Sequence, residues 1–417
     1  MHVISDLHIH SRFSRATSKY INLKNLARYG VMKGIHLLGT GDFQHPEWHE
    51  EIKAELQEDN GIYKAHGMHF MLTTEISLIY TDKGKGRRVH VVVWAPSIAV
   101  AKQIQEQCLK WGRIDYDGRP IFKIPCAEFV ETLKGISDAI EIIPAHVWTP
   151  WFSMYGSMSG YDSFKDCFED QSKRVHAIET GLSSDPDMNW RLPELDNKTI
   201  LSFSDAHSHW PWKLGREATV FDVKQLTYDD VIKAVRNNHV VKTIEFFPEE
   251  GKYHFDGHRN CGVCMHPAES IKQNNICPKC KKQMTIGVAH RVEDLAKRDK
   301  GQGKPYIKLI PLTELVAAYL GSNPQTKKTW ALYDQYIKRF GNEFNVLLDA
   351  PQDKLEAIDA GLAKLIIASR EQKIPFKPGY DGVFGVPQIG GWESKPSAEE
   401  QAPVRPPQPE QKSLGEF

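Results

Sequence analysis

The first ten residues carry three side chains of the types that bind metal ions. Asp6, His8 and His10 alternate along a short apolar run that begins at Val3. On an extended chain alternate side chains share a face, so all three point the same way. Buried together they need partners or a metal ion, whereas on an exposed strand edge they would be solvated by water. We favour metal binding for this stretch.

Further residues of these types follow other predicted strands. Apolar runs at 35–38, 70–74, 140–143, 175–178 and 199–204 alternate with helical periodicity, for example at 48–57 and 228–237. A run at 89–94 is expected to form a hairpin with the run at 70–74. This alternation favours an α/β barrel, in which the loops after the strands build the active site. The side chains expected to converge there are Asp6, His8, His10, Asp42, Glu75, His90, His146, Glu179, Asp205 and His207.

One such histidine would be assigned to the core, but so many at strand ends predict a multinuclear metal site. The motifs resemble those of the PHP (polymerase and histidinol phosphatase) family: Asp6-x-His8-x-His10, Thr40-Gly41-Asp42, Glu75, His90, His146 and Ser204-Asp205-Ala206-His207. The resemblance implies an α/β fold, a distorted (β/α)7 barrel with two or three metals. It implies one metal held by His8, His10, Glu75 and Asp205, and a second by Glu75, His90 and His146. Asp6 then orients an imidazole.

The third metal implied by that family needs histidines near position 15, directly after Asp42, and at His207. Arg15 and Phe43 stand at the first two places, which argues against a conventional third metal. His45 could substitute, and Glu179 is a further candidate ligand. The residues expected to assist catalysis are Asp42, His207 and Arg15.

Two adjacent metal ions suit phosphodiester hydrolysis, because they activate a water and stabilise the attacking and leaving oxygens. Carboxylate and imidazole ligands favour Zn²⁺ or Mn²⁺, with Mg²⁺ as an alternative. Arg12 could clamp a phosphate, or could be a plain surface cation. Trp148, Trp151 and Tyr155 follow the His146 ligand. These aromatic residues either stack on an extruded base or form a packed loop over the barrel.

Two C-x2-C pairs lie in the next segment, Cys261 with Cys264 and Cys277 with Cys280. Four thiolates complete a tetrahedral site, so this spacing predicts a structural Zn²⁺ in a zinc ribbon. No ligand position is left open for catalysis. Free thiols or two disulfides are the less favoured alternatives, and His266 is a weak alternative ligand.

A basic stretch and three apolar helical stripes follow the ribbon. The stripes, near 312–320, 330–340 and 355–366, predict core helices. Lys281 and Lys282 begin the basic stretch, and Lys327 and Lys328 lie early in a predicted helix. We expect these lysines to contact the backbone of duplex DNA, although such runs are commonly only solvated.

The last residues, 393–417, are rich in proline and predict a disordered tail. The tail ends in Gln411, Leu414 and Phe417, a spacing that resembles the box by which proteins bind the sliding clamp PCNA. The usual second aromatic residue is absent, and a chance match is the alternative.

Composition is consistent with a soluble globular protein, at 41% hydrophobic and 25% charged residues with no net charge. Acidic residues slightly exceed basic ones in 1–247, and the reverse holds in 248–392. We expect a PHP catalytic domain at 1–247, a zinc ribbon at 248–290, a basic helical domain at 291–392 and the tail. Without a signal peptide, a membrane-spanning run or a disulfide framework, a cytoplasmic, nucleoid-associated monomer is expected.

The order of these parts resembles the endonuclease Q family of DNA repair nucleases. That resemblance implies nicking of DNA on the 5′ side of deaminated bases (uracil, hypoxanthine, xanthine) or abasic sites. The residues alone reach only a metal-dependent phosphodiesterase acting on nucleic acid. The alternatives are a small-molecule phosphatase of the histidinol-phosphate kind, and a non-catalytic clamp-associated DNA-binding protein.

Overall fold

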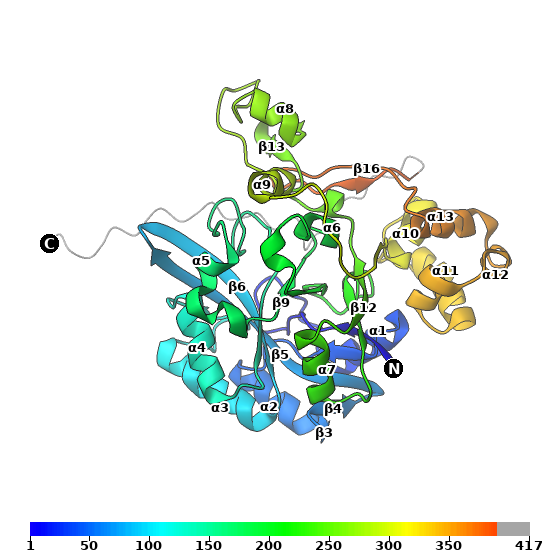
Figure 1. Cartoon of the computed structure of the whole chain (residues 1–417). Coiled ribbons are helices and arrows are strands. Elements are labelled where there is room, and N and C mark those ends of the chain that lie inside the picture. The colour runs from blue at the N-terminus through cyan, green and yellow to red at the C-terminus, as the bar shows by residue number, and fades with distance from the viewer. Residues whose placement is uncertain (390–417) are drawn as a thin grey trace.

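A mixed sheet forms the body of the protein in the computed structural model, which describes residues 1–389 (Figure 1). Its strand order is β15-β12-β11-β1-β2-β5-β4-β3, with β6 joining β5 to β8 and β7 joining β5. Their bounds are β1 His2–Asp6, β2 Leu37–Gly39, β3 Gln57–Asp59, β4 Ile62–Ala65, β5 Met68–Asp82, β6 Lys85–Ala95, β7 Ile121–Phe122, β8 Glu141–Pro144, β11 Ala218–Asp222, β12 Val240–Glu245 and β15 Tyr306–Lys308.

Two more strands bring the sheet back towards β1. β9 (Ala177–Glu179) and β10 (Thr199–Leu201) run parallel. Val147 donates to the Glu179 carbonyl, and His10 donates to the Ala206 carbonyl. These bonds link β8 to β9 and the segment after β10 to the segment after β1. The predicted α/β barrel is therefore confirmed.

Helices cover the outside of this sheet (Figure 1). They are α1 Leu23–Lys33, α2 Pro46–Glu55, α3 Ile98–Trp111, α4 Cys126–Ile136, α5 Phe164–Phe168, α6 Pro186–Asn189 and α7 Tyr228–Arg236. The side chain of Asn22 caps the start of α1, and Gly34 ends it with a left-handed φ of 98°. The helical periodicity at 48–57 and 228–237 corresponds to α2 and α7.

The predicted hairpin is the longest feature of the sheet. β5 and β6 pair antiparallel from Leu72↔Ala95 to Asp82↔Lys85, and the turn at Lys83 and Gly84 has positive φ. Glu75 pairs with Val92 and Ser77 with His90, so the hairpin brings Glu75 and His90 close together. The chain reverses at the hairpin turn, and this reversal returns His90 to the site, as the sequence analysis predicted.

The part of the chain from β13 (Asp256–His258) to α9 (Val288–Leu295) stands off the body in Figure 1. It also contains β14 (Val263–Met265) and α8 (Pro267–Lys272). A small hairpin of β16 (Phe376–Lys377) and β17 (Val386–Pro387), paired antiparallel, follows the last described helix. β15, within the predicted helical domain, adds to the barrel sheet beside β12. The domain boundaries stay predictions.

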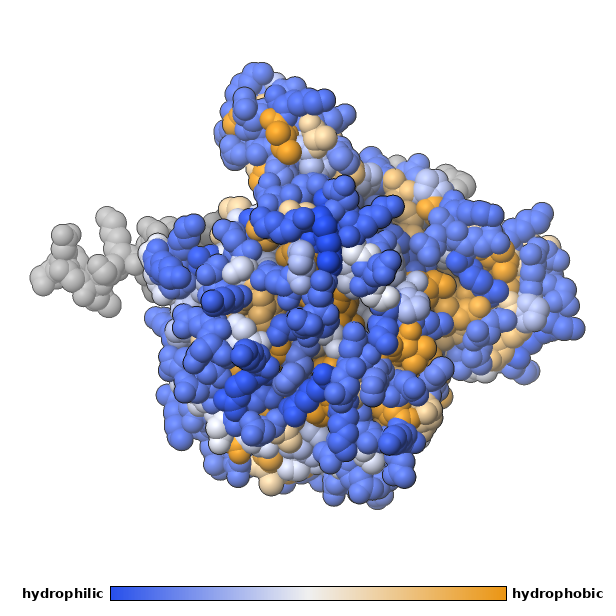
Figure 2. Space-filling model, viewed as in Figure 1, coloured by the Kyte–Doolittle hydropathy of each residue, from blue (hydrophilic) through white to orange (hydrophobic). Residues whose placement is uncertain are grey.

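The predicted helical stripes form α10 (Leu312–Tyr319), α11 (Lys327–Phe340), α12 (Gln352–Glu356) and α13 (Ala360–Arg370). A buried ion pair joins them to the barrel, since Lys33 Nζ of α1 lies 2.7 Å from Glu343 Oε1. Trp210 and Trp212 stack with ring centroids 5.1 Å apart, and both contact Trp330 of α11. Hydrophobic residues gather along this boundary in Figure 2.

None of the helices among residues 1–389 is both long and apolar enough to cross a membrane.

Candidate metal centre

The residues after β1 meet Glu75 and Asp205 at one end of the barrel. His10 Nε2 lies 3.2 Å from Glu75 Oε2 and 3.1 Å from Asp205 Oδ1. His8 Nε2 lies 3.6 Å from each of the same two oxygens. One ligand atom from each residue falls within 4.8 Å of the others. This is the first ligand set that the resemblance to the PHP family implied.

The second predicted set uses the other oxygen of the same carboxylate. Glu75 Oε1 lies 2.7 Å from His90 Nδ1 and 3.2 Å from His146 Nε2. These three residues form a second group whose ligand atoms also lie within 4.8 Å. Because Glu75 offers one oxygen to each group, it is placed to bridge two cations.

Two observations test whether these residues fit metal ions. His8 Nε2 is buried without a hydrogen-bond partner among the described residues, although its Nδ1 is held. Glu75 is fully buried and Asp205 is mostly buried, with a side chain 24% exposed. Buried carboxylates and an unsatisfied imidazole nitrogen aimed at them need a cation, and the donor set suits Zn²⁺ or Mn²⁺.

A second layer of carboxylates holds the histidine rings. Both oxygens of Glu179 lie 2.9 Å from His8 Nδ1, and one also accepts from the His146 backbone N–H. Asp42 Oδ1 lies 3.1 Å from His10 Nδ1. Glu179 and Asp42 therefore orient imidazoles in this structure. Neither belongs to the two metal groups, and Glu179 as a metal ligand stays a prediction that this geometry does not favour.

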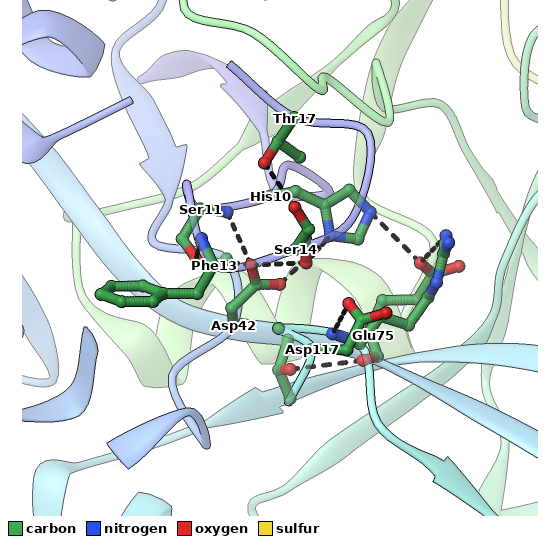
Figure 3. Close-up of polar contacts among 12 residues, drawn as sticks. His10, Ser11, Phe13, Ser14, Thr17, Asp42, Glu75 and Asp117 are labelled. Carbon is green, nitrogen blue, oxygen red and sulfur yellow. Dashed lines mark hydrogen bonds and ion pairs between the residues drawn. The ribbon is translucent and has the colours of Figure 1, made fainter. Parts of the chain in front are cut away.

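Asp42 is fully occupied by protein donors (Figure 3). Its Oδ2 accepts from Ser11 N and Ser11 Oγ at 2.7 Å and from Ser14 Oγ at 2.8 Å. With His10 this makes four contacts, about the capacity of a carboxylate. In this structure Asp42 positions His10 and the loop that follows it, and its catalytic role stays a prediction.

Asp6 performs a similar task behind β1. It accepts from Ser204 N at 3.0 Å, from Ser204 Oγ at 2.6 Å and from Gly215 N at 2.8 Å. Burial raises the pKa of Asp6 to about 6, against these hydrogen bonds, which lower it. Asp6 fixes the loop that carries Asp205 and lies outside both metal groups. The sequence placed it behind an imidazole, and the structure places it behind this loop.

The remaining candidates near the site take different positions. His207 packs its ring 4.6 Å from His10, and burial lowers its pKa to about 4. Arg15 points outward with a side chain 71% exposed and pairs with Asp117 at 3.3 Å. His45 stacks on Phe13 and stands outside both metal groups. Arg15 and His45 therefore do not join the metal centre in this structure.

Charge controls protonation across the site. Burial alone would lower the pKa of His8, but Glu179, Glu75 and Asp205 raise it well above the usual value. For His10, Asp42, Asp205 and Glu75 overcome burial in the same way. Burial lowers the pKa of His90 to about 4, because Glu75 compensates only in part. Without a metal the excess of carboxylates thus holds protons on His8 and His10.

Three residues of the site have backbone conformations that few non-glycine residues adopt. Asp42, His146 and Asp205 have φ values of 46°, 31° and 47°. Such conformations cost of order 1–3 kcal/mol each and cluster at functional sites. All three follow a strand of the barrel, where the left-handed turn directs the side chain inward.

Arg119 is a site residue that the sequence did not reveal. Its Nη1 donates to Glu75 Oε2 at 3.0 Å. It lies in the segment between α3 and β7, far from every motif in sequence. The only local signal is the short polar stretch Asp117-Gly118-Arg119, which is not distinctive.

The aromatic loop after His146 is mostly packed. Trp148 is buried with its Nε1 donating to Asn189, and Tyr155 is buried with its hydroxyl donating to Glu194. Neither ring has a free face, which favours the packed loop over base stacking for these two residues. Trp151 is half-buried, so of the three aromatic candidates it is the one that solvent reaches.

The predicted basic contacts are at the surface. Lys281 and Lys282 are exposed beside the ribbon cysteines, and Lys327 and Lys328 are exposed at the start of α11. Arg12 is half-buried, pairs with Glu51 and lies over the Phe13 ring. Its charge is therefore already partnered.

The ribbon gathers a ligand set that differs from the predicted one. The group is His258, Cys261, Cys277 and Cys280. Cys280 Sγ lies 3.3 Å from His258 Nδ1. Three thiols and one imidazole fit a tetrahedral Zn²⁺.

Cys264 is exposed and falls outside this group. It lies in β14 opposite Gly257, and its neighbour Val263 is buried. Successive strand side chains point to opposite faces, so the strand turns Cys264 away from the other thiols. The spacing C-x2-C alone could not show that β14 begins within the pair.

Comparisons with known proteins extend over this whole architecture. A family model described as the MJ0043 C-terminal domain matches residues 311–373. The uncharacterized protein MJ0043 of Methanocaldococcus jannaschii is 36% identical over 289 residues, 66% of this chain and 35% of that protein. The uncharacterized protein YqxK of Bacillus subtilis is 28% identical over 407 residues, 92% of this chain and 98% of that protein. The chain thus spans about a third of MJ0043 and nearly all of YqxK.

Two solved structures match almost completely. The lesion-specific endonuclease PfuEndoQ from Pyrococcus furiosus has 32% identity and a TM-score of 0.85, covering 97% of this chain and 98% of its own. Endonuclease Q in complex with a 27-mer duplex carrying an abasic lesion gives the same identity and TM-score, with 97% and 99% coverage. The match includes the barrel, the ribbon and the helices.

Proposed function

This chain belongs to the endonuclease Q family, and we propose that it is a metal-dependent DNA repair endonuclease that nicks duplex DNA on the 5′ side of a deaminated base or an abasic site. The observation that carries the proposal is the pair of ligand groups sharing Glu75, in a chain that matches a lesion-specific endonuclease over its whole length. The deaminated bases proposed are uracil, hypoxanthine and xanthine.

The chain's own residues have distinct tasks in this proposal. His8, His10, Glu75 and Asp205 would hold one ion, and Glu75, His90 and His146 the other. Bound there, Zn²⁺, Mn²⁺ or Mg²⁺ would supply a hydroxide at neutral pH and neutralise charge on the phosphate. Glu179 and Asp42 keep the rings of His8 and His10 in register by fixing their Nδ1 atoms. The Nδ1–H group of each ring then points to its carboxylate, and the Nε2 atom of each ring is left for the ion.

Recognition of the lesion is assigned to the surfaces that surround the site. Trp151, which packs edge-on against Tyr253 at 5.6 Å, is the proposed stacking surface for the extruded nucleotide. The exposed lysines at 281, 282, 327 and 328 are the proposed contacts to the duplex backbone. Arg12 is also a proposed contact to the DNA backbone, in which a phosphate would replace Glu51 as its partner. A DNA substrate is in line with a cytoplasmic, nucleoid-associated monomer.

The proposal is tested on duplexes that each carry a single deoxyuridine, deoxyinosine, deoxyxanthosine or abasic site. The parent protein should nick on the 5′ side of the lesion in the presence of metal and leave an unmodified duplex intact. Glu75→Ala and Asp205→Ala should abolish nicking. Undiminished nicking by either variant, or turnover of a phosphate monoester without any nicking, would refute it.

The clamp motif at Gln411, Leu414 and Phe417 lies outside the described residues. We propose it as a contact to PCNA on the spacing of its side chains. Deleting 411–417 should abolish binding to PCNA and leave nicking of free oligonucleotides unchanged. Retained binding would contradict the proposal.

A further inference from the structure

Arg119 is anchored at the metal centre by the segment that carries it. The Pro120 carbonyl accepts from Ser77 N at 3.0 Å, which joins the segment to β5 two residues beyond Glu75. Gly118 N donates to the Phe13 carbonyl at 3.0 Å, and Asp117 accepts from the Arg119 backbone N–H at 3.1 Å. A Cβ at Gly118 would lie 2.2 Å from Asp42 Oδ2, so only glycine permits this approach. The Arg119 backbone is therefore held on both sides.

The guanidinium of Arg119 has one end fixed and the other open. Nη1 donates to Glu75 Oε2, the oxygen that also faces His8 and His10. This is its only side-chain hydrogen bond with a described residue, out of five N–H groups. None of its nitrogens is among the buried atoms without a partner, and the side chain is 25% exposed. The remaining donors thus reach solvent beside the metal groups.

The guanidinium of Arg119 supplies a positive charge next to the carboxylates of the metal groups. Four protein donors already contact Asp42, and Asp42 lies outside both metal groups. Arg15 points outward and pairs with Asp117. Among these side chains, Arg119 alone places a permanent charge against the carboxylate shared by both groups.

We propose that Arg119 binds a non-bridging oxygen of the scissile phosphodiester, through the guanidinium donors that Glu75 leaves free. The inference rests on the proposed nuclease function and adds a phosphate-binding residue to it. A guanidinium is planar and stays charged at any working pH, so two of its N–H groups can reach adjacent phosphate oxygens. Held by Glu75, it is already oriented before the substrate arrives, and charge developing on the phosphate strengthens the contact.

A purely structural role for Arg119 makes a different prediction. If the guanidinium served only to neutralise Glu75, its removal would disturb the metal ligands and lower metal content. If it binds phosphate, its removal leaves Glu75 at least as available to metal and acts on the reaction instead. Metal content measured separately from turnover therefore distinguishes the two roles.

The experiment compares Arg119→Gln and Arg119→Lys with Arg113→Gln, a control on the same segment whose exposed side chain pairs with Asp115. All proteins are loaded with Mn²⁺, their metal content is measured, and nicking of an abasic duplex is followed under single turnover. Arg119→Gln should keep the parent's metal content and lose about 10²–10³-fold in rate, the usual effect of removing one such donor. Arg119→Lys should recover part of that loss, and Arg113→Gln should match the parent.

A modified substrate gives a second measurement, whose result would be the same in parent and variant if Arg119 had a purely structural role. Replacing one non-bridging oxygen of the scissile phosphate by sulfur should slow nicking by the parent. For one of the two diastereomers this slowing should be smaller in Arg119→Gln, because that variant already lacks the contact between Arg119 and the replaced oxygen. Lower metal content in both Arg119 variants, or an unchanged rate in Arg119→Gln, would overturn the proposal. Failure of the parent itself to nick the duplex would instead refute the proposed function.

Discussion

Replacing Glu343 by Gln should strongly destabilise the protein, because Glu343 is the buried counter-charge of Lys33. Both side chains are at most 1% exposed and their charged atoms lie 2.7 Å apart. Glu343 also accepts from Leu312 N and from the Tyr333 hydroxyl, each at 3.0 Å. Lys33 otherwise donates only to the Pro211 carbonyl among the described residues.

The magnitude follows from the charge that stays behind. Glutamine preserves the shape and one accepting oxygen, so most of the packing survives. The ammonium of Lys33 is then buried without a counter-charge, which typically costs about 3–5 kcal/mol. Lys33→Met combined with Glu343→Met removes both charges and should be much less destabilising than Glu343→Gln alone.

Urea unfolding of the parent, Lys33→Met, Glu343→Met and the double variant gives a thermodynamic cycle, and Glu343→Gln is measured beside it. Arg113→Gln removes an exposed ion pair and should leave the unfolding midpoint unchanged. The reasoning is refuted if Glu343→Gln unfolds at the parent's midpoint, or if the double variant loses the sum of both single effects.

Three further outcomes are expected. Adding Zn²⁺ to metal-free protein in a weak buffer should release protons, and affinity should rise with pH, because carboxylates raise the pKa of His8 and His10 while a metal requires neutral rings; a titration without proton release would contradict this. Cys264→Ser should keep the ribbon zinc and His258→Ala should lower it, as elemental analysis would show; the opposite order would restore the four-cysteine site. Trp151→Ala should weaken binding of a lesion duplex by about 1–3 kcal/mol per stacked base relative to intact duplex, and equal losses on both would remove Trp151 from the base contact.

The convergence of the candidate ligands could be predicted because local rules place these side chains, whereas their division into two sets came from the resemblance to the PHP family. Strand alternation put His8 and His10 on one face, and the barrel pattern put Glu75 and Asp205 at the same end. The hairpin turn at Lys83 and Gly84 was sufficient to bring His90 into reach. These features depend on short-range geometry that residue types encode directly.

Other parts of the site depend on tertiary contacts that no local pattern carries. Arg119 reaches Glu75 only because its segment is held by Phe13 and Ser77 from distant elements. Trp148 looked free for stacking, yet Asn189, forty-one residues away, holds its Nε1 in the core. His258 joins the ribbon set and Cys264 does not, because β14 starts inside a C-x2-C pair and pairs with the strand that ends at His258.

The tryptophans between the barrel and α11 can serve as an intrinsic spectroscopic probe. Trp210 and Trp212 follow His207 by a few residues, and their parallel rings lie within 6.3 Å of Trp330 on α11. Indoles at such separations couple their electronic transitions, which produces a strong near-ultraviolet circular dichroism signal. Any separation of the helices from the barrel, on loading with metal or on closing around a duplex, would be recorded in that signal without an attached dye.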